Sequence, residues 1–192
     1  MPKFLVIDNG SIHTAALVRL LPNTPTIVGF DEVDSGISHE YDCIILSGSS
    51  RFPVIGNENL FSRELQLIQE SEKPIIGICL GAELIIHAFG GVLTDLGEKQ
   101  KGIIRITATD PKHILLEDGR NFDVYEAHRF ATKEVPDQFT ILAKSDHGPE
   151  IIKHRIRPIW GLQFHPEHLT DETIGDEIFS RIVYRSFLGN MS

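Results

Sequence analysis

Residues 74–83 read Pro-Ile-Ile-Gly-Ile-Cys-Leu-Gly-Ala-Glu, and they join two segments of different periodicity. The first part is apolar and β-branched, as in a buried strand, whereas residues 84–89 continue as an apolar helix. Cys79 lies at the turn between them, with Gly77 and Gly81 two residues away on either side. A nucleophile elbow needs residues with little or no side chain at these positions, because its sharp turn brings backbone segments close together. The pattern therefore predicts that Cys79 is a nucleophile, whose thiolate the helix N-terminus would favour.

A second stretch, 86 residues downstream, distinguishes this interpretation from an ordinary buried cysteine. Residues 160–167 read Trp-Gly-Leu-Gln-Phe-His-Pro-Glu. In an extended segment, His165 and Glu167 would point to the same side. A cysteine nucleophile needs a base, and the base needs a carboxylate that orients it. Cys79, His165 and Glu167 are therefore expected to form a catalytic triad, with the Leu80 N–H as one oxyanion donor.

The rest of the chain places these motifs in an α/β fold. Continuous apolar runs predict buried parallel strands at residues 3–8, 26–30, 41–47 and 74–78. Helical periodicity predicts helices at residues 11–21, 58–70, 80–89 and 171–187. From Val92 onward, shorter strands are expected at residues 103–109, 122–126, 139–144, 151–153 and 160–164. We expect one domain over residues 1–192: a flavodoxin-like, mostly parallel sheet flanked by helices, with a small antiparallel elaboration in the second half.

Composition and charge argue against several classes of protein. The chain has 192 residues and a net charge of −9, which disfavours broad binding to nucleic-acid phosphates. Its two cysteines, Cys43 and Cys79, suggest neither a disulfide framework nor a cysteine zinc site, and a reducing cytoplasm is the expected setting. No apolar run approaches the length of a membrane span. No histidine pair has convincing ligand spacing, so neither a metal nor another cofactor is expected.

Taken together, these motifs resemble those of the class I (triad-type) glutamine amidotransferases, over nearly the whole chain. Within that class the chain is most similar to the separate amidotransferase subunits of GMP synthases. The supporting stretches lie at residues 7–10, 97–99, 124–128 and 142–145. The resemblance implies that glutamine is the substrate and that ammonia passes to a synthetase subunit, for the amination of XMP to GMP.

The resemblance also implies roles for residues outside the triad. Glu83 stands where the family has a glutamine that holds the amino-acid end of the substrate, and a solvated or salt-bridged residue is the alternative. Asp146 and His147 fall in a substrate-contacting loop of the family, although a surface turn explains them equally well. His128 matches a position near the active-site mouth or the partner interface, and a satisfied polar residue at a strand end is the alternative.

One loop departs from the family pattern. The family usually has Ser-Gly-Gly-Pro where residues 47–50 read Ser-Gly-Ser-Ser, and a backbone N–H of Gly48 or Ser49 would complete the oxyanion hole. If Ser49 needs a positive φ, the hole would be incomplete until a partner or ligand reshapes the loop. This departure, together with Ala82 and Glu83, leaves two alternatives: a silent or partner-gated regulatory relative, and a hydrolase of other γ-glutamyl compounds.

Overall fold

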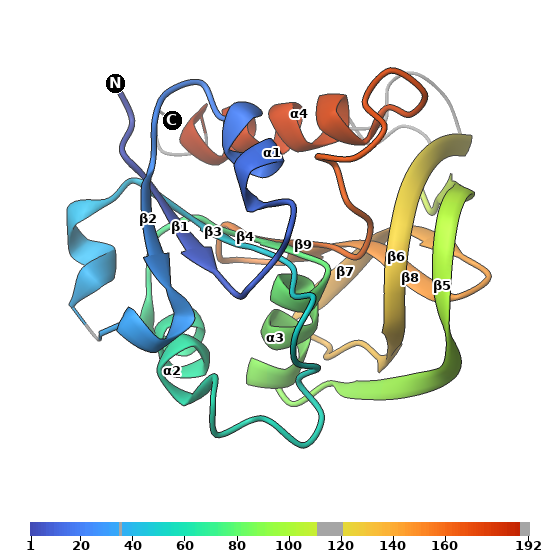
Figure 1. Cartoon of the computed structure of the whole chain (residues 1–192), viewed down its shortest axis with the longest axis horizontal. Coiled ribbons are helices and arrows are strands. Elements are labelled where there is room, and N and C mark those ends of the chain that lie inside the picture. The colour runs from blue at the N-terminus through green and yellow to red at the C-terminus, as the bar shows by residue number, and fades with distance from the viewer. Residues whose placement is uncertain (35, 111–120, 189–192) are drawn as a thin grey trace.

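The structure, a computed structural model, describes residues 1–34, 36–110 and 121–188. In this part of the chain nine strands form one sheet, in the order β2-β1-β3-β4-β9-β8-β7-β5-β6 (Figure 1). The strands are β1 (Phe4–Asp8), β2 (Thr26–Gly29), β3 (Cys43–Leu46), β4 (Ile75–Ile78), β5 (Val92–Ala108), β6 (Asn121–Glu134), β7 (Phe139–Ser145), β8 (Gly148–His154) and β9 (Ile159–Leu162). The helices are α1 (Thr14–Arg19), α2 (Ser62–Glu70), α3 (Leu80–Ala88) and α4 (Gly175–Leu188), with short 3₁₀ turns η1 (Phe30–Glu32) and η2 (Ile37–Glu40).

The first half of the sheet is parallel. Strands β2, β1, β3, β4 and β9 pair in that order and run in one direction. This is the strand order of flavodoxin-like folds, so the expected fold class is confirmed. Because these strands are parallel, the carboxyl ends of β1, β3, β4 and β9 lie at one edge, which is where such folds bind ligands.

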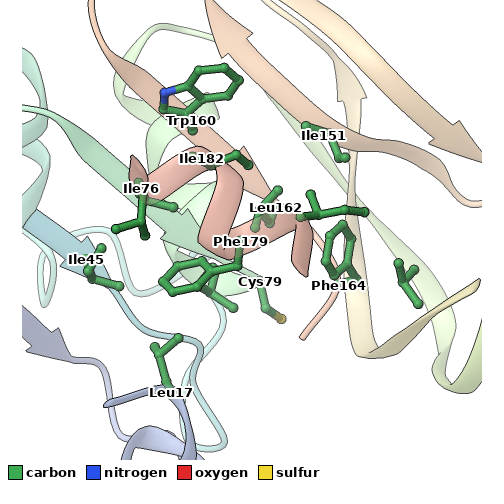
Figure 2. Close-up of a cluster of buried hydrophobic side chains, with 14 of the residues drawn as sticks. Leu17, Ile45, Ile76, Cys79, Ile151, Trp160, Leu162, Phe164, Phe179 and Ile182 are labelled. Carbon is green, nitrogen blue, oxygen red and sulfur yellow. The ribbon is translucent and has the colours of Figure 1, made fainter. Parts of the chain in front are cut away.

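Helices cover both faces of the parallel strands. Figure 1 shows α1 and α4 on one side of the sheet and α2 and α3 on the other. Successive residues of β1 alternate between the two cores, with Val6 facing α1 and α4 and Ile7 facing α2 and α3. On the first face, Leu17 of α1 and Phe179 of α4 belong to the same buried cluster as Ile76 of β4 (Figure 2). Burial on both faces explains why these strands are continuous apolar runs in the sequence.

The antiparallel half extends further than the sequence predicted. Strands β8, β7, β5 and β6 continue the same sheet from β9. In particular, β5 begins at Val92 and β6 continues to Glu134, whereas shorter strands were expected. The register of this ribbon shifts between Asp95 and Gln100, and most residues of β5 before Ile106 are at least partly exposed. The irregular pairing removes the strict alternation by which a strand is recognised in a sequence.

Helices α1, α2 and α4 begin later than the sequence predicted. The Ser11 hydroxyl accepts a hydrogen bond from the His13 N–H (3.0 Å) in a turn before α1, so Ser11 does not cap that helix. Leu169 adopts a φ of 52° and lies in a separate turn before α4. Polar side chains that suit a helix cap suit such turns equally well. None of the described helices has the length and apolar character needed to span a membrane.

Replacing Gly81 by alanine should test how closely α3 approaches β3. A Cβ at Gly81 would lie 2.4 Å from the Leu46 carbonyl oxygen, a backbone atom that cannot turn aside. We expect Gly81→Ala to lower the free energy of unfolding by about 1–3 kcal/mol or more, measured by urea denaturation. In the control Gly36→Ala, the new Cβ would meet its nearest atom at 3.5 Å. Equal losses in the two variants would contradict the close approach.

Candidate active site

The turn at Cys79 has the backbone shape of a nucleophile elbow. Cys79 adopts φ 50° and ψ −106° at the start of α3, a conformation that non-glycine residues rarely adopt. A Cβ at Gly77 would lie 2.4 Å from the backbone of Gly81, so no side chain fits there. The two glycines thus allow the strand and the helix to meet at Cys79, as the sequence predicted.

Strand β9 carries the candidate base to the same edge of the sheet. It lies parallel to β4, and the Cys79 N–H donates to the Leu162 carbonyl (2.7 Å). Beyond β9, the His165 Nδ1 lies 2.8 Å from a carboxylate oxygen of Glu167, and both side chains are buried. The segment turns at Glu167 instead of staying extended, so the expected conformation was wrong although the expected pair forms. The carboxylate fixes the proton on Nδ1 and leaves Nε2 to accept one.

Gly48 lies next to both the candidate nucleophile and the candidate base. A Cβ on Gly48 would lie 3.1 Å from the His165 Cε1 atom and 3.5 Å from the Cys79 Cβ. Both candidate catalytic side chains therefore pack against one glycine of the loop after β3. The structure brings together all three members of the predicted triad, which come from the carboxyl ends of two neighbouring strands.

The Cys79 thiol is not stabilised as a thiolate in this structure. Burial raises its pKa well above the usual value, and the nearby carboxylates of Glu83 and Glu167 raise it further. The Leu80 N–H, a hydrogen-bond donor to the sulfur, acts in the opposite direction without reversing the shift. The helix N-terminus thus favours the thiolate as expected, but burial has the larger effect on the pKa. A neutral thiol at rest needs His165 to take its proton as it attacks.

In the loop after β3, the described residues leave the backbone N–H groups of Gly48 and Ser49 free to bind an oxyanion, although position 49 is not a glycine. Ser49 is not among the described non-glycine residues with positive φ. The backbone strain that a serine would have at positive φ therefore does not arise at this position. Instead the Ser49 hydroxyl accepts hydrogen bonds from the N–H groups of Arg51 (3.1 Å) and Phe52 (3.2 Å) and stabilises the turn. Among the described residues, no acceptor pairs with the N–H of Gly48 or Ser49. The proposed oxyanion role of these groups stays a prediction.

A pocket of about 180 Å³ opens beside Cys79. It is smaller than the roughly 300–1,000 Å³ of pockets for drug-sized ligands, and so suits a small substrate. Its lining includes Glu83 and His128, but not Asp146 or His147. The full lining is Ser49, Ser50, Arg51, Phe52, Pro53, Cys79, Leu80, Glu83, Lys99, Ala127, His128, Arg129 and Phe130. A substrate contact by Asp146 or His147 stays a prediction.

Glu83 lies in the pocket wall and is linked to the nucleophile through Gln163. Its side chain is almost fully buried, and its Oε1 accepts a hydrogen bond from the Gln163 Nε2 (3.2 Å). The same Nε2 lies 4.0 Å from the Cys79 sulfur. Burial raises the pKa of Glu83 to about 7, so the carboxyl is only partly ionised near neutral pH. Sequence pattern alone did not single out Gln163, although it follows the apolar run of β9 directly.

A family model described as "Glutamine amidotransferase class-I" matches residues 5–184. The chain belongs to this family. It is 35% identical to a subunit of a glutamine-hydrolysing GMP synthase from Methanothermobacter thermautotrophicus, over 84% of this chain and 80% of that protein. It is 36% identical to the corresponding subunit from Thermococcus kodakarensis, over 95% of both chains. The crystal structure of a protein from Thermoplasma acidophilum, assigned as the same GMP synthase subunit, superposes with a TM-score of 0.87 at 26% identity, covering 100% of this chain and 96% of that one.

Next to its pocket, the amidotransferase holds a buried cluster of titratable side chains. The Glu126 carboxylate lies 3.0 Å from the His128 Nε2 and 2.9 Å from the His147 Nδ1. The other ring nitrogen of His128 lies 2.9 Å from the Phe130 carbonyl oxygen. Burial is the largest effect and lowers the pKa of His128, but the hydrogen bond to Glu126 and the charges of the nearby carboxylates together outweigh it and raise the pKa. Both ring nitrogens face acceptors, so His128 carries a positive charge here.

We expect Glu83→Gln to change how the stability of the amidotransferase depends on pH. The pKa of Glu83 is higher in the folded state than in the unfolded state. The stability that this difference contributes is fully present below the ordinary pKa of a glutamate and is lost as the pH rises through about 7. The amide cannot ionise, so its stability advantage over wild type should grow by roughly 3 kcal/mol between pH 4 and pH 8. Chemical denaturation at several pH values measures it, with the exposed Glu134→Gln as control. A pH-independent difference would refute the raised pKa.

Proposed function

We propose that this amidotransferase hydrolyses glutamine to glutamate and ammonia and delivers the ammonia to a separate synthetase subunit that makes GMP. The observation that carries the proposal is that Cys79 and the His165–Glu167 pair both lie against Gly48. The two relatives described above, from Methanothermobacter thermautotrophicus and Thermococcus kodakarensis, support the choice of glutamine and of GMP synthesis.

In the proposed mechanism, the base generates the nucleophile at the moment of attack. His165 Nε2 takes the thiol proton of Cys79 as the sulfur adds to the side-chain amide carbon of glutamine. Glu167 stabilises the imidazolium that forms. The oxyanion is held by the backbone N–H groups of Leu80 and of Gly48 or Ser49. The proton then passes to the leaving ammonia, and water hydrolyses the glutamyl thioester to glutamate.

The raised pKa of Glu83 supports glutamine as the substrate. An ionised glutamate would repel the α-carboxylate of the substrate, whereas a protonated one offers a hydrogen-bond donor and an acceptor, as the family's glutamine does. Two cationic residues, Arg51 and Lys99, also line the pocket and suit a carboxylate. The pocket is thus compatible with a free amino acid at neutral pH.

The proposed synthetase is a separate chain. The sequence contains no phosphate-binding glycine loop and no stretch resembling a nucleotide-activating synthetase. The relatives are themselves named as subunits, which supports a two-chain enzyme. His128 lines the pocket and stays our candidate for the active-site mouth or the partner interface.

The first test is ammonia release from glutamine by the purified chain. We expect release that Cys79→Ala lowers by at least about 10³-fold, because removal of a nucleophile leaves only binding and electrostatic effects. A coupled glutamate dehydrogenase assay measures the release.

The other outcomes distinguish the alternative functions. If glutamine is not hydrolysed but γ-glutamyl amines are, the chain is a hydrolase of other γ-glutamyl compounds. If release requires an added GMP synthetase subunit, the chain is gated by its partner. No turnover in any arm would identify a silent relative.

The pH dependence of KM tests the role of Glu83. As pH rises above 7, Glu83 ionises and repels the substrate carboxylate, so KM for glutamine should rise by up to roughly tenfold between pH 7 and pH 8.5. Glu83→Gln should keep KM flat over this range, whereas Glu134→Gln should follow the wild type. Steady-state kinetics at fixed ionic strength provides the measurement. A flat wild-type profile would show that Glu83 does not contact the substrate.

A further inference from the structure

The buried cluster next to the pocket offers more ligand atoms than its own hydrogen bonds use. Glu126 and His128 lie on β6, His147 lies in the turn between β7 and β8, and Glu150 lies on β8. The ligand atoms of Glu126, His128 and His147 all lie within 4.8 Å of one another. We propose that Glu126, His128 and His147 form a binding site for a divalent transition metal beside Glu150, with Zn²⁺ as the ion that fits best.

The histidines are oriented as metal ligands usually are. The His128 Nδ1 donates to the Phe130 carbonyl (2.9 Å), which directs Nε2 toward Glu126. A ligating histidine commonly donates its other ring N–H to a carbonyl or carboxylate in this way. Without a metal, Nε2 has to hold a proton in order to face the carboxylate. A cation placed between His128, His147 and Glu126 takes over the role of that proton.

Glu150 provides independent evidence that the cluster binds a cation. Its side chain is 1% exposed, and its Oε1 accepts a hydrogen bond from the Ser145 hydroxyl (2.7 Å). Its Oε2 is buried and has no partner among the described residues. Burial raises the pKa of Glu150 to about 7, whereas the Ser145 hydrogen bond and the charge of His128 lower it. A buried carboxylate oxygen without a partner is rare and unfavourable, and a nearby cation would stabilise the ionised form of Glu150.

Distances and charge both suit zinc. Zinc binds nitrogen and oxygen ligands at about 2.0–2.2 Å, so neighbouring ligands of a tetrahedral ion lie roughly 3.3 Å apart. The Glu126 carboxylate lies 3.0 Å and 2.9 Å from the two histidines, so small outward movements would admit the ion. The Glu126 carboxylate and two neutral imidazoles would bind the ion, and Glu150 when ionised would add a second negative charge that balances it. The His147 side chain is 31% exposed, whereas those of Glu126 and His128 are 1% exposed, so entry is from the His147 side.

The test is a zinc titration of the full chain by isothermal calorimetry after treatment with EDTA. All variants carry Cys79→Ala, so that zinc cannot bind through the catalytic thiol and His165. We expect one equivalent to bind, and Glu126→Gln to weaken binding at least tenfold, because the isosteric amide removes the central charged ligand. The exposed Glu134→Gln on the same strand should bind zinc as the parent does. Cobalt substitution provides a second readout, an intense visible absorption that Glu126→Gln abolishes.

Two outcomes would overturn the proposal. One is the absence of stoichiometric zinc binding to the Cys79→Ala chain, which would leave the cluster as a hydrogen-bonded ion pair. The other is equal zinc affinity in Glu126→Gln and Glu134→Gln, which would place the ion elsewhere. Melting curves in EDTA check that each variant is folded. If Glu126→Gln fails to fold, the partly exposed His147→Asn replaces it, with the same expected loss of at least tenfold.

Discussion

The contact between backbones at Gly77 and Gly81 is the constraint on which the active site depends. A side chain at either position would overlap main-chain atoms of α3 or of β3. Only this close packing holds Cys79 at φ 50°, because an isolated residue would leave that conformation. The sulfur therefore sits at the carboxyl edge of the sheet. The hydrogen bond from the Cys79 N–H to Leu162 ties that edge to the strand that leads to His165.

Burial then sets the chemistry of the site. The thiol of Cys79 is kept neutral, and the carboxyl of Glu83 titrates near neutral pH, because both are removed from water. A neutral thiol is a weak nucleophile, so activation depends on the His165–Glu167 pair and takes place with substrate bound. Such an arrangement limits side reactions of the cysteine while the pocket is empty.

Hydrogen bonding at one position and burial at the other compensate for two departures from the family pattern. Ser49 lacks the conformational freedom of glycine. Its hydroxyl instead accepts hydrogen bonds from two backbone N–H groups, and these stabilise the loop without a positive φ. Glu83 carries an acid where the family has an amide, but burial raises its pKa until the protonated form can make similar hydrogen bonds. Neither compensation follows from residue identity, since each depends on what surrounds the side chain.

Local patterns in the sequence determined the parallel half of the fold and the triad. Strands buried on both faces are apolar runs, and a nucleophile elbow is set by neighbours two residues apart, so both could be predicted. The tertiary structure alone decided the lengths of β5 and β6, the protonation of Cys79 and Glu83, and the cluster around Glu126. In the strand order β6 lies three places from β8, and only the curvature of the sheet brings the side chains of Glu126 and His147 together. Distances and burial arise from packing between distant segments, which sequence spacing does not encode.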